Sequence, residues 1–222
     1  MPSTLNQKTA ELYCNILDEV KTRLEIIDRA LAQETHDKHD RIAVSDLCSL
    51  QFRKVFEAIA LGCLLVHGDL PGTTKLKMDV YRADKLLKSL ERLNPDFYPV
   101  PCQVIRDPVG ALRVRKFVSG EWMTKAKMRK LYFNLDHEMH VGTLTRRALV
   151  ADPVSHDSLT TILRWTRALL ASHVIDLQDR EFRLVGQMNA ADAVPTATLQ
   201  RRRPNTPMTR RGSSLKMTVS PS

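Results

Sequence analysis

The sequence has few of the features that mark a metal, disulfide or membrane protein. Its four cysteines lie far apart without a C-x-x-C pair, which argues against a zinc site and a disulfide framework and fits a reducing compartment. The longest uncharged apolar run spans residues 58–66, whereas a membrane-spanning helix needs about 20 residues. No apolar segment follows a basic start, so no signal peptide is expected. We therefore expect a soluble cytoplasmic protein without membrane association.

Glycine and aromatic residues are also scarce. There are only 8 glycines, and the motifs G-x-x-x-x-G-K-S/T, G-x-G-x-x-G and G-x-S-x-G do not occur. Glycine-rich loops that cradle phosphates and strained nucleophile turns are therefore not expected. Aromatic residues make up 5% of the chain and hydrophobic residues 43%, which predicts a mainly aliphatic core. No cofactor and no metal are predicted.

Apolar residues instead recur at helical spacing along most of the chain. In residues 5–33, Tyr13, Leu17, Val20 and Leu24 form one stripe, as a helix that buries one face requires. The stripe predicts packing inside the domain, and a homodimer through residues 5–33 is the alternative. The same spacing predicts four further helices, over residues 45–67, 74–93, 124–141 and 157–176.

Two short segments alternate as strands do. Three prolines in residues 94–101 exclude a helix there. The segments CQVIR and LRVRKFV then flank a turn and predict a β-hairpin near residues 102–118, and EFRLV predicts a last strand over 181–185. We predict a mainly α fold, a bundle of about five helices with this small inserted hairpin, over residues 1–186. Residues 187–222 are predicted to be a disordered basic tail.

The net charge of +9 is concentrated in two places. From residue 186 onwards there are six basic residues and one acid, a net charge of +5. Residues 113–130 hold seven basic residues and one acid, with Trp122 among them. Together with a basic helix face in residues 74–93, this band could track a phosphate backbone. The predicted nucleic-acid contacts are Lys75, Arg82, Lys88, Arg113, Arg115, Lys125, Lys127 and Arg129; a solvated basic face is the alternative.

The basic tail admits several interpretations. The segments RRRP and RRGSSLK resemble nucleic-acid arms or tethers for anionic partners. The stretch RRGSSL also resembles a substrate of a basophilic kinase. A disordered terminus without a selected role is an equal alternative.

Arg53 and Glu57 stand one turn apart where a predicted helix becomes apolar on all sides. Because burying either charge alone is costly, each needs a partner. We predict a structural ion pair that fixes packing. The alternative is that Arg53 reaches into a cleft and Glu57 orients it.

The segment LDHEMH offers a candidate for catalysis. Asp136 and His140 are four residues apart on a predicted helix, and a carboxylate beside an imidazole favours its charged form. His137 and His140 could also seat a metal with His173 as a third ligand. A capped, partly exposed helix end explains the same residues without either chemistry.

Three segments, SDLCSLQFRKVFEAIALGCLLVHGD, LERLNPDFYPVP and LYFNLDHEMHVG, resemble a set of uncharacterised bacterial and phage proteins. Over roughly residues 5–175 their helical part is similar to the HEPN superfamily. The resemblance implies a helical bundle; many HEPN members are ribonucleases of toxin–antitoxin and phage-defence systems, and others only bind partners or nucleotides.

The HEPN nuclease motif is an Arg, usually followed by a polar residue, with four to six residues between the Arg and a following His. Arg29 with His36 and Arg167 with His173 match this spacing, although Ala30 and Ala168 stand at the polar position. The resemblance makes Arg167 and His173 the first candidates for catalysis, ahead of Asp136 and His140. HEPN nucleases typically form their site in a dimer.

The sequence thus predicts a cytoplasmic helical protein that binds RNA, DNA or a partner protein without catalysis of its own. A HEPN-like ribonuclease and a dimeric protein-interaction subunit are the two alternatives.

Overall fold

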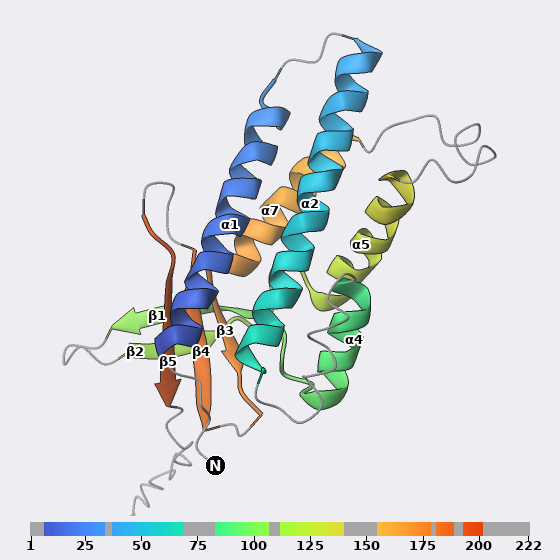
Figure 1. Cartoon of the computed structure of the whole chain (residues 1–222). Helices are drawn as coiled ribbons and strands as arrows, with labels where there is room; N and C mark the ends of the chain where they lie inside the picture. The colour runs from blue at the N-terminus through green and yellow to red at the C-terminus, as the bar shows by residue number, and fades with distance from the viewer. Residues whose placement is uncertain are drawn as a thin grey trace, which may run out of the picture.

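The computed structural model describes residues 7–33, 37–68, 83–106, 112–139, 155–178, 181–188 and 193–201. Within these ranges the chain forms five helices and one five-stranded antiparallel sheet (Figure 1). The prediction of a helical bundle with a small hairpin is therefore wrong. The hairpin exists, but it is one edge of a sheet that shares the core with the helices.

The helices α1 (Gln7–Leu31) and α2 (Lys38–Val66) form a long antiparallel pair (Figure 1). The predicted stripe of α1 is buried against α2, α7 and the sheet. One chain thus covers the stripe that a homodimer through residues 5–33 would have used. Gly62 on α2 permits the close approach, because a Cβ there would lie 3.0 Å from the Tyr13 ring.

Helix α2 begins earlier than predicted, at Lys38 rather than near residue 45. The Asp37 side chain accepts a hydrogen bond from the Asp40 backbone N–H at 2.9 Å. A capping carboxylate satisfies a backbone donor that has no partner in the first turn. The polar residues just before position 45 thus form the start of the helix, whereas the predicted end at His67 is confirmed.

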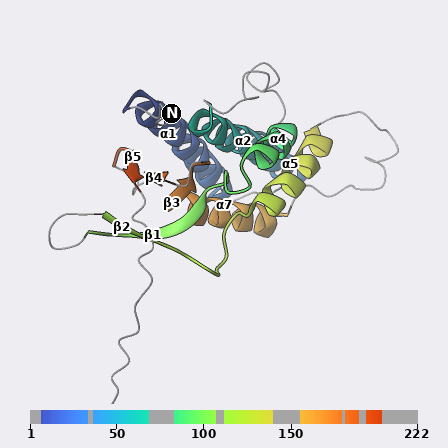
Figure 2. The same cartoon turned by 90° about the horizontal axis from the view of Figure 1, so that it is seen from below.

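Three shorter helices complete the helical part: α4 (Ala83–Leu93), α5 (Lys125–Met139) and α7 (His156–Leu170). Leu86, Leu87 and Leu90 of α4 and Met128 of α5 are buried in the same core as α2. Figures 1 and 2 place α4 and α5 side by side at the end of the molecule away from the hairpin.

The sheet has the strand order β2-β1-β3-β4-β5. Its strands are β1 (Val100–Arg106), β2 (Leu112–Lys116), β3 (Ser172–Asp176), β4 (Phe182–Gln187) and β5 (Thr196–Arg201). Strand β3 is central and pairs with both β1 and β4. Ile175 and Leu184 join the helical core from one face, and Cys102, Val174 and Val185 form a small second core on the other.

Two strands of this sheet, β3 and β5, are missing from the sequence prediction. The helix predicted over residues 157–176 ends at Leu170, and residues 172–176 form β3, because a short buried apolar run has no periodicity that separates helix from strand. Residues 196–201 lie within the predicted tail, but they pair with β4 along its whole length. The folded chain therefore extends beyond Gly186. Residues 202–222 lie outside the described ranges.

The sheet curls so that its two edges approach each other. Strands β2 and β5 are at opposite ends of the strand order, yet the Gln200 side-chain amide donates a hydrogen bond to the Leu112 carbonyl. Arg183 orients that amide by donating to the Gln200 side-chain oxygen at 2.9 Å. This curl carries the β2 edge away from α4 and α5 (Figure 2).

Candidate nucleic-acid interface

The eight cations predicted to contact phosphate do not form one surface. Lys75 and Arg82 lie outside the described residues. Arg113 and Arg115 are exposed on the hairpin, opposite Ile105 and Gln103 of β1. Figures 1 and 2 both place β2 at the far side of the molecule from α4 and α5. The basic band of residues 113–130 is therefore divided between two regions.

Two of the predicted cations contact other side chains of the protein. The Lys125 ammonium forms an ion pair with Glu91 at 2.5 Å and lies 5.5 Å from the centre of the Phe97 ring. The Lys127 ammonium lies 3.8 Å from the centre of the Trp165 ring and donates to the Trp122 carbonyl at 3.3 Å. Such contacts hold α5 in place, so these lysines act in packing.

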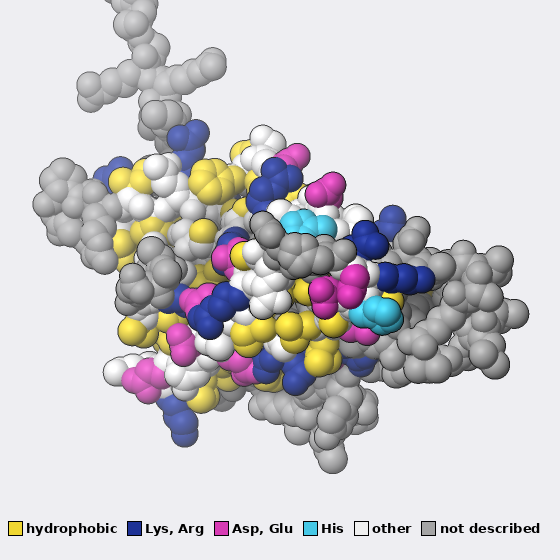
Figure 3. All heavy atoms as spheres, turned by 90° about the horizontal axis from the view of Figure 1, so that it is seen from above, with side chains coloured by type: hydrophobic (Ala, Val, Ile, Leu, Met, Phe, Trp, Pro, Cys, Tyr) yellow, Lys and Arg dark blue, Asp and Glu magenta, His cyan; other side chains and the backbone are white. Residues whose placement is uncertain are grey.

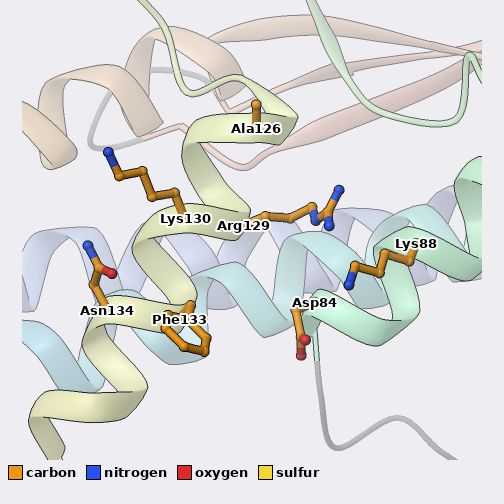
Figure 4. Close-up of a pocket in the computed structure, with 7 residues that line it drawn as sticks. All are labelled: Asp84, Lys88, Ala126, Arg129, Lys130, Phe133 and Asn134. Carbon is orange, nitrogen blue, oxygen red and sulfur yellow. The ribbon is translucent and has the colours of Figure 1, made fainter.

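The remaining two, Lys88 and Arg129, line a surface hollow of about 400 Å³ between α4 and α5. Figure 4 shows their side chains reaching toward the same gap from the two helices. The other lining residues are Asp84, Ala126, Lys130, Phe133 and Asn134. Three cations and one carboxylate give the lining a formal charge of +2.

The exposed groups of this lining are chemically mixed. Lys88, Lys130 and Asn134 are exposed, and the Phe133 side chain is 54% exposed. Lys88 and Lys130 make no ion pair with another residue in the described ranges. The hollow thus places exposed cations and an exposed amide beside the half-exposed Phe133 side chain.

Sequence spacing alone could have identified most of this set. Ala126, Arg129, Lys130, Phe133 and Asn134 recur at three- and four-residue intervals, so they share one face of α5. Asp84 and Lys88 are four apart on α4. Lys130, Phe133 and Asn134 are not among the predicted contacts, because the spacing within α5 does not show that this face lies beside α4.

The hollow is fixed by two polar anchors. At one end the Lys125–Glu91 pair joins α5 to α4, and its hydrogen bond lowers the pKa of the Glu91 carboxyl, as does the nearby charge of Arg129. At the other anchor Tyr132 donates a hydrogen bond of 2.9 Å to Glu57 of α2. Burial, followed by that bond, raises the pKa of Tyr132.

Arg53 and Glu57 form the ion pair that the sequence suggested, with a distance of 3.2 Å. The Arg53 guanidinium also lies 5.5 Å from the centre of the Tyr132 ring. The pair therefore works at the junction of α2 and α5, where it orients Glu57 toward Tyr132. This arrangement favours the packing role over a role in a cleft.

The candidate catalytic pair is not brought together. Arg167 lies on α7 and pairs with Asp28 of α1 at 3.2 Å, with 43% of its side chain exposed. His173 lies on β3, fully buried, and contacts Tyr13. Burial lowers the pKa of His173 to about 4. A buried neutral imidazole and a surface guanidinium on separate elements do not form a common site within this chain.

The second catalytic candidate lies outside the described side chains. Asp136 and His137 belong to α5, but the side chains described for that helix end at Leu135, and His140 lies outside the described residues.

Among the described residues, no group of three or more His, Cys, Asp or Glu side chains is arranged to hold a metal ion. No helix within those ranges is long and apolar enough to cross a membrane.

Charge on another face of the molecule is mixed. Figure 3 looks onto the end where α1 finishes and α2 begins, and acidic and basic side chains are interspersed there. The ion pairs Arg29–Glu25 and Arg167–Asp28 belong to this helical region. Such a face gives a polyanion less attraction than the cation-rich hollow.

Comparisons with protein-family models, with curated proteins and with solved structures found no match to this chain. The resemblance to HEPN proteins therefore stays an expectation from sequence.

Proposed function

We propose that this protein binds nucleic acid by contacting phosphate groups at the hollow between α4 and α5. The observation that carries the proposal is the convergence of Lys88 and Arg129, from two different helices, on one solvent-filled gap. Like charges that converge repel each other, and a phosphate between them relieves the repulsion. The proposal is one of binding and includes no catalytic step.

The rigidity of the site supports the proposal. The Lys125–Glu91 pair sets the spacing of α4 and α5, and the Tyr132–Glu57 hydrogen bond fixes α5 on α2. A site that is formed before binding loses less conformational entropy when the ligand arrives. The two helices therefore present their cations from backbone positions that are fixed relative to each other.

Salt dependence tests this proposal. The full chain is titrated with labelled RNA and with labelled DNA at several salt concentrations, and each mixture is run on native and denaturing gels. Because each neutralised phosphate releases counterions, affinity should fall steeply as salt rises. Retention that ignores salt would contradict phosphate contact. RNA shortened on the denaturing gel would point instead to a ribonuclease.

A matched pair of variants locates the site. Lys88→Gln combined with Arg129→Gln removes two positive charges at the hollow, and Arg113→Gln combined with Arg115→Gln removes two at the hairpin. The first variant should reduce the slope of log affinity against log salt by roughly 1.5. The second should change it much less. An equal effect of both would show that net charge alone, and not the hollow, governs binding.

A further inference from the structure

Strand β2 forms one edge of the sheet, and among the described strands it has β1 as its only neighbour. An edge strand presents backbone N–H and C=O groups to which an extended peptide can pair as a further strand. We propose that the open edge of β2 binds a segment of a partner protein in which acidic and apolar residues alternate. This proposal goes beyond nucleic-acid binding, and its surface lies on the far side of the molecule from the α4–α5 hollow (Figures 1 and 2).

One hydrogen bond shows which backbone groups of β2 face the open edge. The Phe117 N–H donates to the Pro101 carbonyl of β1 at 3.0 Å. In an antiparallel pair, alternate residues make such bonds, and the residues between them point their backbone groups outward. Lys116 and Val114, which lie one and three residues before Phe117, therefore direct their N–H and C=O groups away from β1. Among the described residues, no hydrogen bond from outside β1 reaches the backbone of either.

The contact between the two sheet edges supports the same direction. Leu112 lies two residues before Val114, and its carbonyl accepts a hydrogen bond from the Gln200 side chain of β5. The Leu112 carbonyl thus points away from β1, as the alternation requires. The same contact sets one end of the open segment, since β5 approaches β2 at Leu112. Beyond it, Val114 and Lys116 each present one donor and one acceptor to an added strand.

The side chains of β2 select the kind of peptide. Arg115 is exposed and makes no ion pair with another described residue, and residues 112–120 contain three basic residues and no acid. An acidic residue directly opposite Arg115 forms a favourable cross-strand pair, whereas a basic one is repelled. On the other face of the sheet Val114 packs on the small second core, so an apolar residue opposite it extends that packing. Because successive side chains of a strand alternate between faces, acidic and apolar residues should alternate in the bound segment.

The charge of β2 disfavours two other occupants of its edge. In a pair of identical copies, β2 of one chain would lie beside β2 of the other, and like charges opposite each other destabilise such a pairing. The C-terminal segment of the chain, residues 202–222, has five basic residues and no acidic residue, so it is repelled in the same way. The occupant is therefore a segment of another protein.

The test measures binding of a short labelled peptide, in which Glu and Val alternate, to the full chain by fluorescence anisotropy at neutral pH. A peptide with Lys in place of Glu should not bind. Two further peptides carry a methyl group on the backbone nitrogen, one at every Glu and one at every Val. Because only one of these sets of N–H groups can face β2, one peptide should bind at least about tenfold more weakly and the other should bind as before. Equal loss in both, or in neither, would contradict strand addition.

A matched pair of protein variants tests the charge. Arg115→Glu should weaken binding of the peptide of Glu and Val by about fivefold. Lys54→Glu changes the net charge by the same amount at an exposed position of α2, and it should leave binding nearly unchanged. An equal effect of both would show that net charge, and not the β2 edge, attracts the peptide.

The outcome can be separated from that of the proposed function. Peptide binding that survives Lys88→Gln with Arg129→Gln would support a second, independent surface. If the wild-type chain does not bind the peptide but loses RNA binding in Arg115→Glu, the proposal is rejected and the hairpin cations belong to a nucleic-acid surface.

Discussion

The Tyr13 hydroxyl and the His173 Nε2 atom lie 2.7 Å apart in the core, although 160 residues separate them in the chain. The other ring nitrogen, Nδ1, lies 3.2 Å from the Leu170 carbonyl, which can only accept. Nδ1 therefore carries the proton and Nε2 accepts from Tyr13. A neutral imidazole satisfies both contacts, and this one residue joins α1, the end of α7 and β3.

The buried imidazole makes stability depend on pH. Burial lowers the pKa of His173 from an ordinary value of 6.5 to about 4, so between these values the unfolded chain binds more protons. Stability should therefore fall as pH drops from 6.5 toward 4, by on the order of 3 kcal/mol. Burial also lowers the pKa of His67, which acts in the same direction.

Urea denaturation at pH 7.5, 6, 5 and about 4.5 measures this dependence. In His173→Gln the group that titrates is gone, so the slope of stability against pH should be smaller than in the wild type, with a remainder from His67. Identical slopes for the two proteins would contradict the assignment to His173.

Gly186 on β4 leaves the space that the His173 ring occupies. A Cβ at this position would lie 2.5 Å from Nε2 and 3.1 Å from the Tyr13 ring. Gly186→Ala should destabilise the protein by roughly 1–3 kcal/mol through overpacking. In a His173→Ala background the same substitution should cost clearly less, because the ring is absent. Additive effects in this double-mutant cycle would exclude the contact as the cause.

The Tyr132–Glu57 hydrogen bond should matter more than a neutral one. Tyr132→Phe removes a donor to a carboxylate at 2.9 Å, and a loss of about 1.5–3 kcal/mol is expected. Tyr98 is the matched control: it donates to the neutral Met123 carbonyl at 3.2 Å, so Tyr98→Phe should cost about 1 kcal/mol. Thermal or urea unfolding gives both values. A cost for Tyr98→Phe equal to or above that for Tyr132→Phe would refute the ranking.

Lys116 of β2 forms an ion pair with Asp176 of β3, across the intervening strand β1. The Asp176 side chain is only 5% exposed, whereas that of Lys116 is 39% exposed. Lys116→Met would leave the carboxylate buried without this cation, and a loss on the order of 3 kcal/mol is expected at neutral pH. The double variant Lys116→Met with Asp176→Leu should recover part of that loss. If it recovers nothing, the buried charge is not what makes the single substitution costly.

Removal of β5 should lower the stability of the whole fold, because this strand is part of the sheet. The strand pairs with β4 along its length, Ala197 and Leu199 pack on the core, and Gln200 bridges to β2. A chain that ends at residue 188 should therefore be markedly less stable than one that ends at residue 201. Equal unfolding midpoints for the two truncations would show that β5 adds nothing to the fold.

Local patterns in the sequence determined much of the helical part and the hairpin of the sheet. The stripe of α1, the end of α2 at His67, the hairpin of β1 and β2 and the start of α5 follow from spacing and from turn residues, which act over a few positions. The pairing of Arg53 with Glu57 is equally local, because four residues make one helical turn. The i, i+4 relation of Asp84 to Lys88 belongs to the same kind.

Tertiary structure decided the remaining strands of the sheet and the meeting of α4 and α5 at the hollow. Strand β3 is central, so burial on both faces removed the alternation that marks a strand, and β5 became recognisable only through its pairing with β4. The fold places Arg167 and His173 in separate contacts and divides the basic band between two regions. It also brings Lys125 and Lys127 into packing contacts. Lys88 met Arg129 because α4 packs against α5, a contact between helices that no spacing within either helix specifies.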